Sequence, residues 1–408
     1  MKICIVGLGY VGFPLAQLCA SKGHEVFGVD TFQEKIEKIN KGINPIEGGP
    51  IEHKINATTD DVTFVSNAEV IIICVPTPVD HLKMPDLNPV INAVKFVVKN
   101  ISGKPLVVVE STINPGVMED IVLPLFKGYT LDVDYNLAHC PERINPGDPV
   151  WNVSNIPRVV GGFTPNCTER AYAFYSSIVD GKITKMSSIR VAEATKIVEN
   201  TFRDINIAFV NELAKSFDKL GIDTVEVIKG ASTKPFAFMA HYPSCGVGGH
   251  CIPVDPYYLI EEAKAKGFDH KFLKLAREIN NSMPSYTVGL VISALNHHKR
   301  ALNGTTVGVL GLSYKANVGD IRESPSMEVI KLLKKGGAEV ITYDPFIKSS
   351  DCKTLEEFQE KCKFIVLCTN HKEFAQLDFS QIKILIDGKN MFYGHDITPN
   401  VTYRGVGR

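Results

Sequence analysis

Little in the sequence points to a membrane or to nucleic acid. The longest apolar run, Val70 to Val75, has six residues, whereas a membrane-spanning helix needs about 20. The 408 residues include 44 basic and 45 acidic side chains without a block of either sign, so no surface for nucleic acid or anionic lipid is indicated. The N-terminus reaches a glycine turn after one short apolar segment, unlike a secretory signal. We expect neither a membrane nor a nucleic-acid partner.

Metal-binding patterns are missing as well. The ten cysteines are scattered, without a CxxC or CxxxC pair and without histidines at metal-ligand spacing. This usage is typical of reduced thiols in a cytoplasm, and not of disulfides or a structural zinc site. We predict a cytoplasmic protein without a bound metal.

What the sequence does contain is a repeated alternation of short apolar runs with helical stretches such as Phe13–Lys22 and Thr31–Lys41. A chain of this length exceeds one ordinary core, so two or three domains are expected. The apolar runs are of the kind buried on both faces of a parallel sheet. They lie at Lys2–Val6, Glu25–Asp30, Val70–Val75, Leu106–Glu110, Arg158–Gly161, Thr306–Leu310, Glu339–Tyr343, Phe364–Cys368 and Ile382–Ile386.

Between the two groups of strands the pattern changes to long helices. Residues 191–220 contain no proline or glycine, and Gly221 follows as a helix stop. An apolar stripe at helical spacing runs along this segment, and it consists of Ala194, Val198, Phe202, Ile205 and Phe209. A second helical stretch, 272–302, contains Pro284.

The predicted fold class is therefore α/β. Two Rossmann-like, doubly wound parallel-sheet domains, residues 1–190 and 303–408, are joined by a central helical domain, residues 191–302. A helix of about 30 residues would be roughly 45 Å long, longer than a small domain is wide. We expect it to join a homodimer or larger assembly through its apolar stripe.

The segment Gly7-Leu-Gly9-Tyr-Val-Gly12 follows a predicted strand and opens a helix, and Asp30 ends the next strand. Such glycines allow a tight turn and a close approach of the backbone to a pyrophosphate at the helix N-terminus. Asp30 would accept hydrogen bonds from the adenine ribose. No arginine follows Asp30 to bind a 2′-phosphate, so the pattern favours NAD over NADP. The alternative is a glycine turn that only permits close packing.

The segment Gly246-Val-Gly-Gly-His-Cys-Ile-Pro-Val-Asp255 surrounds one thiol, Cys251, with glycines and places a carboxylate four residues later. A glycine-rich loop lets a substrate approach the backbone, and its amides help to lower the pKa of a thiol. This setting favours a nucleophile over a buried packing cysteine. The nearby Cys245 has no partner at fixed spacing, and we interpret it as structural.

Four further polar residues are candidates on weaker grounds. Lys196 and Asn200 are four residues apart and share one helix face, opposite the apolar stripe; a solvated face is the simpler interpretation. Thr112 and Glu142 follow predicted strands, at the end of an α/β sheet where ligands bind. Loop carboxylates are more often merely exposed.

Seven motifs in order along the whole chain resemble the UDP-glucose/GDP-mannose 6-dehydrogenase family. They are GLGYVG (Gly7–Gly12), CVPTP (Cys74–Pro78), EST (Glu110–Thr112), PER (Pro141–Arg143), EATKIVENTFRDINIAFVNEL (Glu193–Leu213), GVGGHCIPVDP (Gly246–Pro256) and GLSYKANVGDIRESPS (Gly311–Ser326). The sequence GGHCIPVDPYYL resembles that of the family branch that oxidises UDP-N-acetylhexosamines. His250 and Val254 stand where the UDP-glucose enzymes typically have serine and lysine.

The resemblance implies a four-electron oxidation of a C6 hydroxyl to a carboxylate with two NAD. The aldehyde must be captured as a tetrahedral adduct before a second hydride can leave, so Cys251 would form a thiohemiacetal and then a thioester. Lys196 and Asn200 would stabilise the developing oxyanions. Asp255, Glu142 and Thr112 would hold and activate the hydrolytic water.

The resemblance also assigns binding residues, with the active site in a cleft between the two α/β domains. The cofactor would contact Gly7, Gly9, Tyr10, Val11, Gly12, Asp30, Lys35, Pro76, Thr77, Thr112 and Arg322. The substrate would contact Glu142, Arg143, Ile144, Lys196, Asn200, Gly248 and Lys315.

Two departures from the family pattern affect substrate binding. Many relatives carry an arginine, supplied by the partner subunit, before the cysteine loop, but residues 232–244 contain none. In the family an Arg-Arg or Arg-Asn pair often follows the last strand, but this chain has Lys389-Asn390, and a lysine binds a diphosphate without bidentate geometry.

Three alternatives to a UDP-N-acetylhexosamine dehydrogenase remain. UDP-glucose is one alternative substrate. Among the N-acetylhexosamines, the overall resemblance favours mannosamine slightly over glucosamine. A two-electron 3-hydroxyacid dehydrogenase shares the first domain and the lysine/asparagine pair, but needs neither the Cys251 loop nor the third domain. A non-catalytic nucleotide-sugar binding protein would have lost the cysteine or the lysine.

Overall fold

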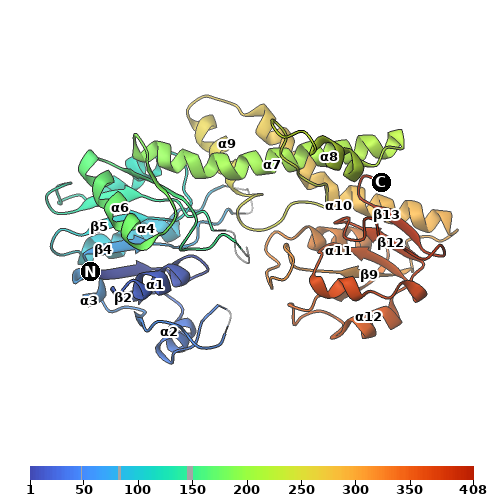
Figure 1. The fold of residues 1–408 in the computed structure, drawn as a ribbon, viewed down its shortest axis with the longest axis horizontal. Coiled ribbons are helices and arrows are strands. Elements are labelled where there is room, and N and C mark those ends of the chain that lie inside the picture. The colour runs from blue at the N-terminus through green and yellow to red at the C-terminus, as the bar shows by residue number, and fades with distance from the viewer. Residues whose placement is uncertain (47, 81–83, 145–149) are drawn as a thin grey trace. The chain divides into compact units, whose positions relative to one another are not determined.

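The computed structural model describes residues 1–46, 48–80, 84–144 and 150–408. The chain forms two compact units. Unit 1 comprises residues 1–199 and 257–267, and unit 2 comprises residues 200–256 and 268–408. Each unit contains one sheet (Figure 1), and each is described by itself.

The sheet of unit 1 has eight strands among the described residues, in the order β3-β2-β1-β4-β5-β6-β7-β8. All neighbours are parallel except β6 and β7, which are antiparallel. The strands are β1 (Lys2–Val6), β2 (Glu25–Val29), β3 (Asn56–Thr58), β4 (Val70–Ile73), β5 (Leu106–Val109), β6 (Asn136–His139), β7 (Arg158–Gly162) and β8 (Ile183–Lys185). The predicted α/β class with a mainly parallel sheet is confirmed.

Both faces of this sheet are covered by helices. One core contains side chains of α1 (Gly12–Ser21), α2 (Gln33–Asn40) and α6 (Pro165–Ile178). The opposite core involves α3 (Thr63–Ser66), α4 (Asn88–Asn100), the π-helical turn Met118–Val122 and α5 (Leu123–Leu125). Along β5, Leu106 and Val108 face the first core and Val107 and Val109 the second, which explains the unbroken apolar run.

The sheet of unit 2 is parallel throughout its described strands, in the order β10-β9-β11-β12-β13. These are β9 (Thr306–Leu310), β10 (Glu339–Tyr343), β11 (Phe364–Leu367), β12 (Ile384–Asp387) and β13 (Thr402–Gly405). The core on one face includes α10 (Lys271–His297) and α11 (Pro325–Lys335), and the core on the other includes α12 (Leu355–Lys361). Short 3₁₀ turns span Lys372–Gln376 and Phe379–Gln381.

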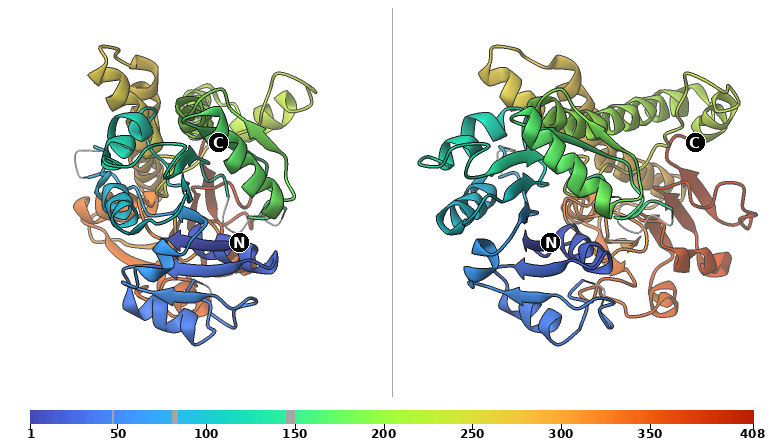
Figure 2. Two further views of the ribbon diagram at one scale, coloured as in Figure 1. Left: turned by 90° about the vertical axis from the view of Figure 1, so that its left-hand side faces the viewer. Right: turned by 60° about the vertical axis from the view of Figure 1, so that its left-hand side comes forward.

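The helical region between the sheets contains α7 (Ile189–Leu220), α8 (Thr224–Ala231), α9 (Asp255–Ala265) and α10. Figure 2 shows α7 as one continuous helix, and α10 continues through Pro284. Among the described residues no helix is both long and apolar enough to cross a bilayer.

On the long helix α7, several apolar side chains are exposed within the single chain, whereas Lys196 on the opposite face is buried. Of the apolar stripe, Val198, Phe202 and Phe209 are exposed by 56%, 48% and 53%. Lys196, on the face for which a solvated role was the simpler interpretation, is only 7% exposed. The polar face of α7 is thus the one that packs within the chain, and the apolar face is uncovered.

Candidate active site

The glycine turn after β1 has the geometry that the sequence predicts. Gly7 has a φ of +96°, and a Cβ atom there would lie 2.7 Å from the carbonyl oxygen of Cys74. A side chain at Gly12 would collide with the Gly7 carbonyl, and α1 begins at Gly12 itself. Only glycine fits these two positions, and the turn delivers the chain directly into a helix N-terminus, where backbone N–H groups attract an anion.

Asp30 lies buried beside this turn. Its Oδ2 accepts hydrogen bonds from the backbone N–H of Leu8 at 2.8 Å and from Lys35 Nζ at 2.6 Å. Its Oδ1 accepts one from the backbone N–H of Phe32 at 3.0 Å. One lone pair of Oδ1 therefore remains for a ligand hydroxyl. Lys35, one of the predicted cofactor contacts, thus places a cation next to Asp30.

The loop after β4 forms the next part of this sheet edge. Pro76 is exposed and Thr77 half-buried, and the Thr77 carbonyl oxygen accepts a hydrogen bond from the Tyr258 hydroxyl of α9. Tyr10 and Val11, at the entrance to α1, are exposed and half-buried. These residues surround the glycine turn at the carboxyl ends of β1 and β4, where α/β sheets bind ligands.

Thr112 and Glu142 follow the adjacent strands β5 and β6. Burial raises the pKa of Glu142 to about 7, although Lys196 and Arg158 lower it. Lys196, which is buried on α7, thus acts electrostatically on this carboxyl group. A carboxyl group with a pKa near neutrality suits general base catalysis at neutral pH.

Two neighbours of Glu142 in the chain are also fixed. Arg143 pairs with Glu199 of α7 at 2.5 Å and donates to the Pro157 carbonyl at 2.9 Å. Ile144 is half-buried, and its N–H donates to the Glu142 carboxylate. Both predicted substrate contacts therefore belong to the same segment as Glu142.

Glu193, which the sequence analysis did not single out, anchors the Thr112 loop to α7. Its carboxylate accepts hydrogen bonds from the backbone N–H groups of Gly116 at 2.7 Å and Met118 at 2.9 Å. Burial raises its pKa to about 7 in spite of these bonds. The available signal was its position in α7, three residues before Lys196.

In unit 2 the cysteine loop turns directly into α9. The backbone N–H of Asp255 donates to the Cys251 carbonyl oxygen at 2.9 Å, and Asn200 Nδ2 donates to Asp255 Oδ2 at 2.5 Å. Asp255 is buried, whereas Cys251 and Asn200 are half-buried. One turn of chain thus places the carboxylate near the thiol-bearing residue and links it to α7.

Glycines let this loop pack against the loop that carries Lys315 and Arg322. Cβ atoms at Gly248 or Gly249 would lie 2.8 Å from Tyr314, and the N–H of Gly249 donates to the Arg322 carbonyl at 3.1 Å. Lys315 is half-buried, and the exposed Arg322 is paired with Asp320 at 2.5 Å. In addition to the predicted approach of a substrate to the backbone, close packing against this loop is a reason for the glycines.

Cys245, interpreted as structural, is fully buried in the core of unit 2. Its thiol donates to the Cys368 carbonyl oxygen at 3.4 Å. A hydrogen bond with the Cys368 thiol lowers the pKa of Cys245 to about 7, assisted by Lys389 and opposed by burial.

The predicted residues are therefore divided between the two units. Unit 1 carries Gly7, Gly9, Tyr10, Val11, Gly12, Asp30, Lys35, Pro76, Thr77, Thr112, Glu142, Arg143, Ile144 and Lys196. Unit 2 carries Asn200, Gly248, Cys251, Asp255, Lys315 and Arg322.

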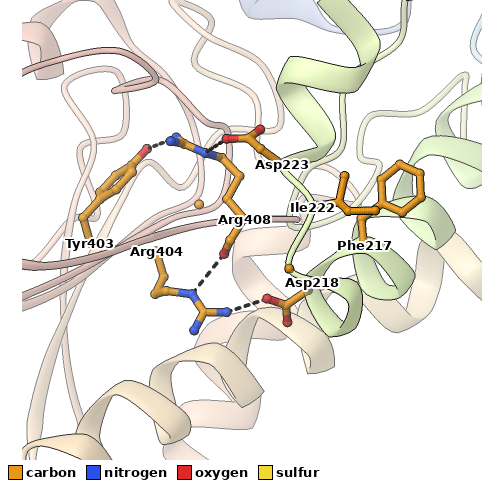
Figure 3. A pocket seen from close by; sticks show the side chains of 9 residues that line it. Phe217, Asp218, Ile222, Asp223, Tyr403, Arg404 and Arg408 are labelled. Carbon is orange, nitrogen blue, oxygen red and sulfur yellow. Dashed lines mark hydrogen bonds and ion pairs between the residues drawn. The ribbon is translucent and has the colours of Figure 1, made fainter.

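A separate surface pocket of about 330 Å³ lies in unit 2 between the end of α7 and β13 (Figure 3). Arg404 pairs with Asp218 at 2.6 Å, and Arg408 pairs with Asp223 at 2.8 Å. None of the predicted site residues lines it. The ion pairs attach the end of the chain to the helical region, and we assign them a structural role.

Family models match the chain in three consecutive parts. The NAD binding domain of the UDP-glucose/GDP-mannose dehydrogenase family matches residues 1–179, the central domain of that family residues 190–282, and its UDP binding domain residues 308–398.

Individual relatives match over nearly the whole chain. A UDP-N-acetyl-D-mannosamine dehydrogenase from Pyrococcus horikoshii is 35% identical, with 100% of this chain and 99% of the relative covered. A solved structure of that enzyme superposes with a TM-score of 0.93 over the same shares of the two chains. A UDP-N-acetyl-D-mannosamine dehydrogenase from Methanococcus maripaludis is 38% identical, covering 96% and 93%. A UDP-N-acetyl-D-glucosamine 6-dehydrogenase from Pseudomonas aeruginosa is 35% identical, covering 96% of each chain.

Proposed function

The chain belongs to the UDP-glucose/GDP-mannose dehydrogenase family of NAD-dependent oxidoreductases, and from this premise we propose that it oxidises the C6 hydroxyl of a UDP-N-acetylhexosamine to a carboxylate. The observation that carries the proposal is the Cys251 turn. Among the ten cysteines, all in the described part of the chain, Cys251 alone is not buried. It lies in a glycine-rich loop one turn before the carboxylate of Asp255.

NAD, when bound, supplies the hydride acceptor for both oxidation steps. The residues of the first unit fit the cofactor, because there is open space at Gly9 beside the start of α1 and Asp30 retains acceptor capacity toward a ribose. Loss of a proton from the C6 hydroxyl and of a hydride from C6 would first give the aldehyde, and the Cys251 thiolate would then attack this aldehyde to form a thiohemiacetal. Loss of hydride from C6 gives a thioester, and water then releases the carboxylate and the thiolate.

The remaining residues act on oxygen atoms and on protons. Lys196 and Asn200 donate hydrogen bonds to the oxygen at C6 as negative charge develops on it. Glu142 removes a proton from the hydrolytic water, which a carboxylate with a pKa of about 7 does efficiently near neutral pH. Thr112 and Asp255 position that water. Gly248, Arg143, Ile144 and Lys315 contact the substrate, and Arg322 contacts the cofactor.

The choice of sugar rests on the names of the relatives and on the cysteine loop. Two of the three relatives described above oxidise UDP-N-acetyl-D-mannosamine and one oxidises UDP-N-acetyl-D-glucosamine. UDP-N-acetylmannosamine is therefore our first candidate, UDP-N-acetylglucosamine the second and UDP-glucose the third.

We also propose a homodimer in a reducing, cytoplasmic setting. The exposed side chains of Val198, Phe202 and Phe209 lie on one face of α7, and such an apolar face suits an isologous contact. None of the ten cysteines forms a disulfide. The mass in solution by light scattering tests the assembly, and a monomer at micromolar concentration would contradict it.

The test of function counts NADH per sugar. The three UDP-sugars are incubated singly with NAD in excess, and the proposal expects two NADH for each molecule of the preferred N-acetylhexosamine. One NADH per sugar would favour a two-electron dehydrogenase, and no turnover with any of them would reject the activity.

The Cys251→Ser variant tests the thiol itself. Serine is a much poorer nucleophile at neutral pH, so turnover should fall by about three orders of magnitude or more while NAD binding is retained. Cys245→Ser is the matched control in the same loop, since a hydroxyl can also donate to the Cys368 carbonyl, and it should keep most of its activity. Near-normal turnover of Cys251→Ser would remove the covalent mechanism.

A further inference from the structure

A fully buried ion pair lies beneath the segment that carries Glu142. Arg158, the first residue of β7, places Nη1 3.0 Å from Oε1 of Glu110, which directly follows β5. The two side chains are 2% and 0% exposed. The hydroxyl of Tyr175, from α6, donates to the same Glu110 oxygen at 2.5 Å.

The stability of the fold does not explain this pair. Burying two opposite charges costs as much as their attraction returns, and apolar replacements of similar size are often neutral or stabilising. The pair is also incompletely satisfied, because Glu110 Oε2 and Arg158 Nε have no hydrogen-bond partner among the described residues. A costly arrangement of this kind, next to a candidate catalytic group, indicates a role in the chemistry.

Both members of the pair are connected to the Glu142 segment. The backbone N–H of Glu142 donates to the Glu110 carbonyl oxygen at 3.3 Å. On the other side, Arg143 donates to the carbonyl of Pro157, the residue before Arg158. A change in the ion pair is therefore transmitted to the position of Glu142.

The charges around Glu142 come from three elements. Lys196 and Glu199 face it from α7, Arg158 from β7 and Glu110 from the end of β5. Burial has the largest effect on the pKa of Glu142 and raises it, Lys196 and then Arg158 lower it, and Glu110 raises it. Lys196 and Arg158 alone would lower the pKa of Glu142 and make its carboxylate a weaker base. The negative charge of Glu110 offsets part of this effect.

We propose that Arg158 and Glu110 form a positioning pair that holds the Glu142 segment, in which Glu110 offsets the charge of Arg158 beside the carboxylate that activates the hydrolytic water. The pair touches neither substrate nor cofactor in this assignment and acts through Glu142. The proposal rests on the proposed function, since it concerns the hydrolysis step of that reaction.

Two single variants with opposite expected effects test the pair. Glu110→Gln keeps the shape of the side chain and leaves Arg158 charged. In a plot of kcat against pH, the acid limb should therefore move to lower pH by about one unit, and the maximum kcat should be lower. Arg158→Gln removes one of the two cations that lower the pKa of Glu142 and should move the limb to higher pH. The double variant should lie between the two.

A buried ion pair elsewhere in the chain provides the control. Arg277 and Asp204 lie 2.5 Å apart and are 5% and 1% exposed, on α10 and α7. Asp204→Asn breaks this pair as Glu110→Gln breaks the other, and it should lower stability without moving the acid limb. If the acid limb shifted as far in Asp204→Asn as in Glu110→Gln, the shift would be a general effect of breaking a buried ion pair. That result would overturn the proposal.

A second readout does not depend on turnover. The infrared band of the protonated Glu142 carboxyl group, assigned by its loss in Glu142→Gln, should titrate at lower pH in Glu110→Gln than in the wild type, and at higher pH in Arg158→Gln. If one variant does not fold, the other is sufficient for the test. In either folded variant, an unchanged acid limb of the kcat profile together with an unchanged titration of the infrared band would overturn the proposal. Absence of NADH formation by the wild type would instead reject the proposed function, and the infrared titration would still test the pair.

Discussion

The two sheets begin with the same turn but use it differently. Gly7 follows β1 and Gly311 follows β9, with φ values of +96° and +85°. The N–H of Gly7 donates to the Val29 carbonyl at 2.7 Å, and the N–H of Gly311 donates to the Tyr343 carbonyl at 2.8 Å. In both units the next strand then ends in a buried aspartate.

The hydrogen bonds of the two aspartates correspond. Oδ2 of Asp30 accepts from the N–H of Leu8, and Oδ2 of Asp344 accepts from the N–H of Leu312, both at 2.8 Å. Each Oδ1 accepts from the backbone N–H two residues later, at 3.0 Å and 2.8 Å respectively.

The difference lies in what fills the rest of the site. Gly9 has open space around it, whereas the corresponding Ser313 donates to Asp344 from its N–H at 2.8 Å and its hydroxyl at 2.9 Å. His371 Nε2 adds a further contact to Asp344 at 3.0 Å. Oδ2 of Asp344 thus accepts from donors of three residues, Leu312, Ser313 and His371, whereas Oδ2 of Asp30 accepts only from Leu8 and Lys35. We infer that Asp344 mainly holds the loop after β9 in place, while the open space at Gly9 leaves Asp30 accessible to a ligand.

The start of the following helix differs accordingly. In unit 1, α1 begins five residues after Gly7, so helix N–H groups point at the turn. In unit 2, α11 begins only at Pro325, and the intervening loop carries Lys315 and Arg322. One turn thus presents a backbone anion site, and the other presents cationic side chains on a loop.

The largest expected effect comes from truncating the two aspartates. Asp344→Ala leaves several buried donors without an acceptor and should reduce the free energy of unfolding by about 3–5 kcal/mol, without changing NAD affinity. Asp30→Ala should instead weaken NAD binding by about tenfold, and it should improve NADP relative to NAD because Lys35 remains. Urea unfolding and calorimetric titration measure both quantities. Equal losses of stability with unchanged NAD binding would contradict the division of roles.

A smaller effect is expected on the pH dependence of stability. Burial raises the pKa of Asp344, but hydrogen bonds from His371 and Ser313 outweigh it and bring the pKa to about 2, below the usual value of about 3.9. A lowered pKa stabilises the folded state above pH 4, and this contribution of about 2–3 kcal/mol is lost as the pH falls from about 4 to 2. The difference in unfolding free energy between wild type and Asp344→Asn should therefore shrink over that range. A difference independent of pH would reject this assignment.

The smallest effects are expected when one residue is exchanged in each of the two turns, after β1 and after β9. Ser313→Gly removes one hydroxyl hydrogen bond and adds flexibility, so it should cost about 1–2 kcal/mol of stability and leave NAD affinity unchanged. Gly9→Ser should leave stability nearly unchanged, since a Cβ meets nothing there, and weaken NAD binding by crowding the pyrophosphate. Reversed effects in the two turns would show that the correspondence is only superficial.

Apolar runs allowed most central strands to be predicted from the sequence. The predicted Lys2–Val6 and Thr306–Leu310 coincide with β1 and β9, because these strands are buried on both faces. A strand was expected before Glu142, but the bounds of β6, with the sequence Asn-Leu-Ala-His, were not predicted, because two polar residues are buried in it. Asn136 donates there to the thiol of Cys167 at 3.3 Å, a partner 31 residues away that only the fold supplies.

The candidate site shows the same limit. Spacing was enough to identify the glycine turn and Cys251, because their chemistry depends on residues close in the sequence. Glu110 and Arg158 are 48 residues apart and meet only because β5 and β7 flank β6. A charged residue at the end of an apolar strand was the available signal, but its partner could not be named without the strand order.

The distribution of the sulfur atoms has a practical consequence. Nine of the ten cysteines are buried and one, Cys251, is partly exposed. A chromogenic disulfide reagent should therefore release about one equivalent of dye per native chain, which counts competent molecules in a preparation. In denaturant the other nine become reactive, so the same reagent also counts unfolded molecules. A single bench assay would then distinguish an inactive but folded variant from a misfolded one before any sugar nucleotide is available.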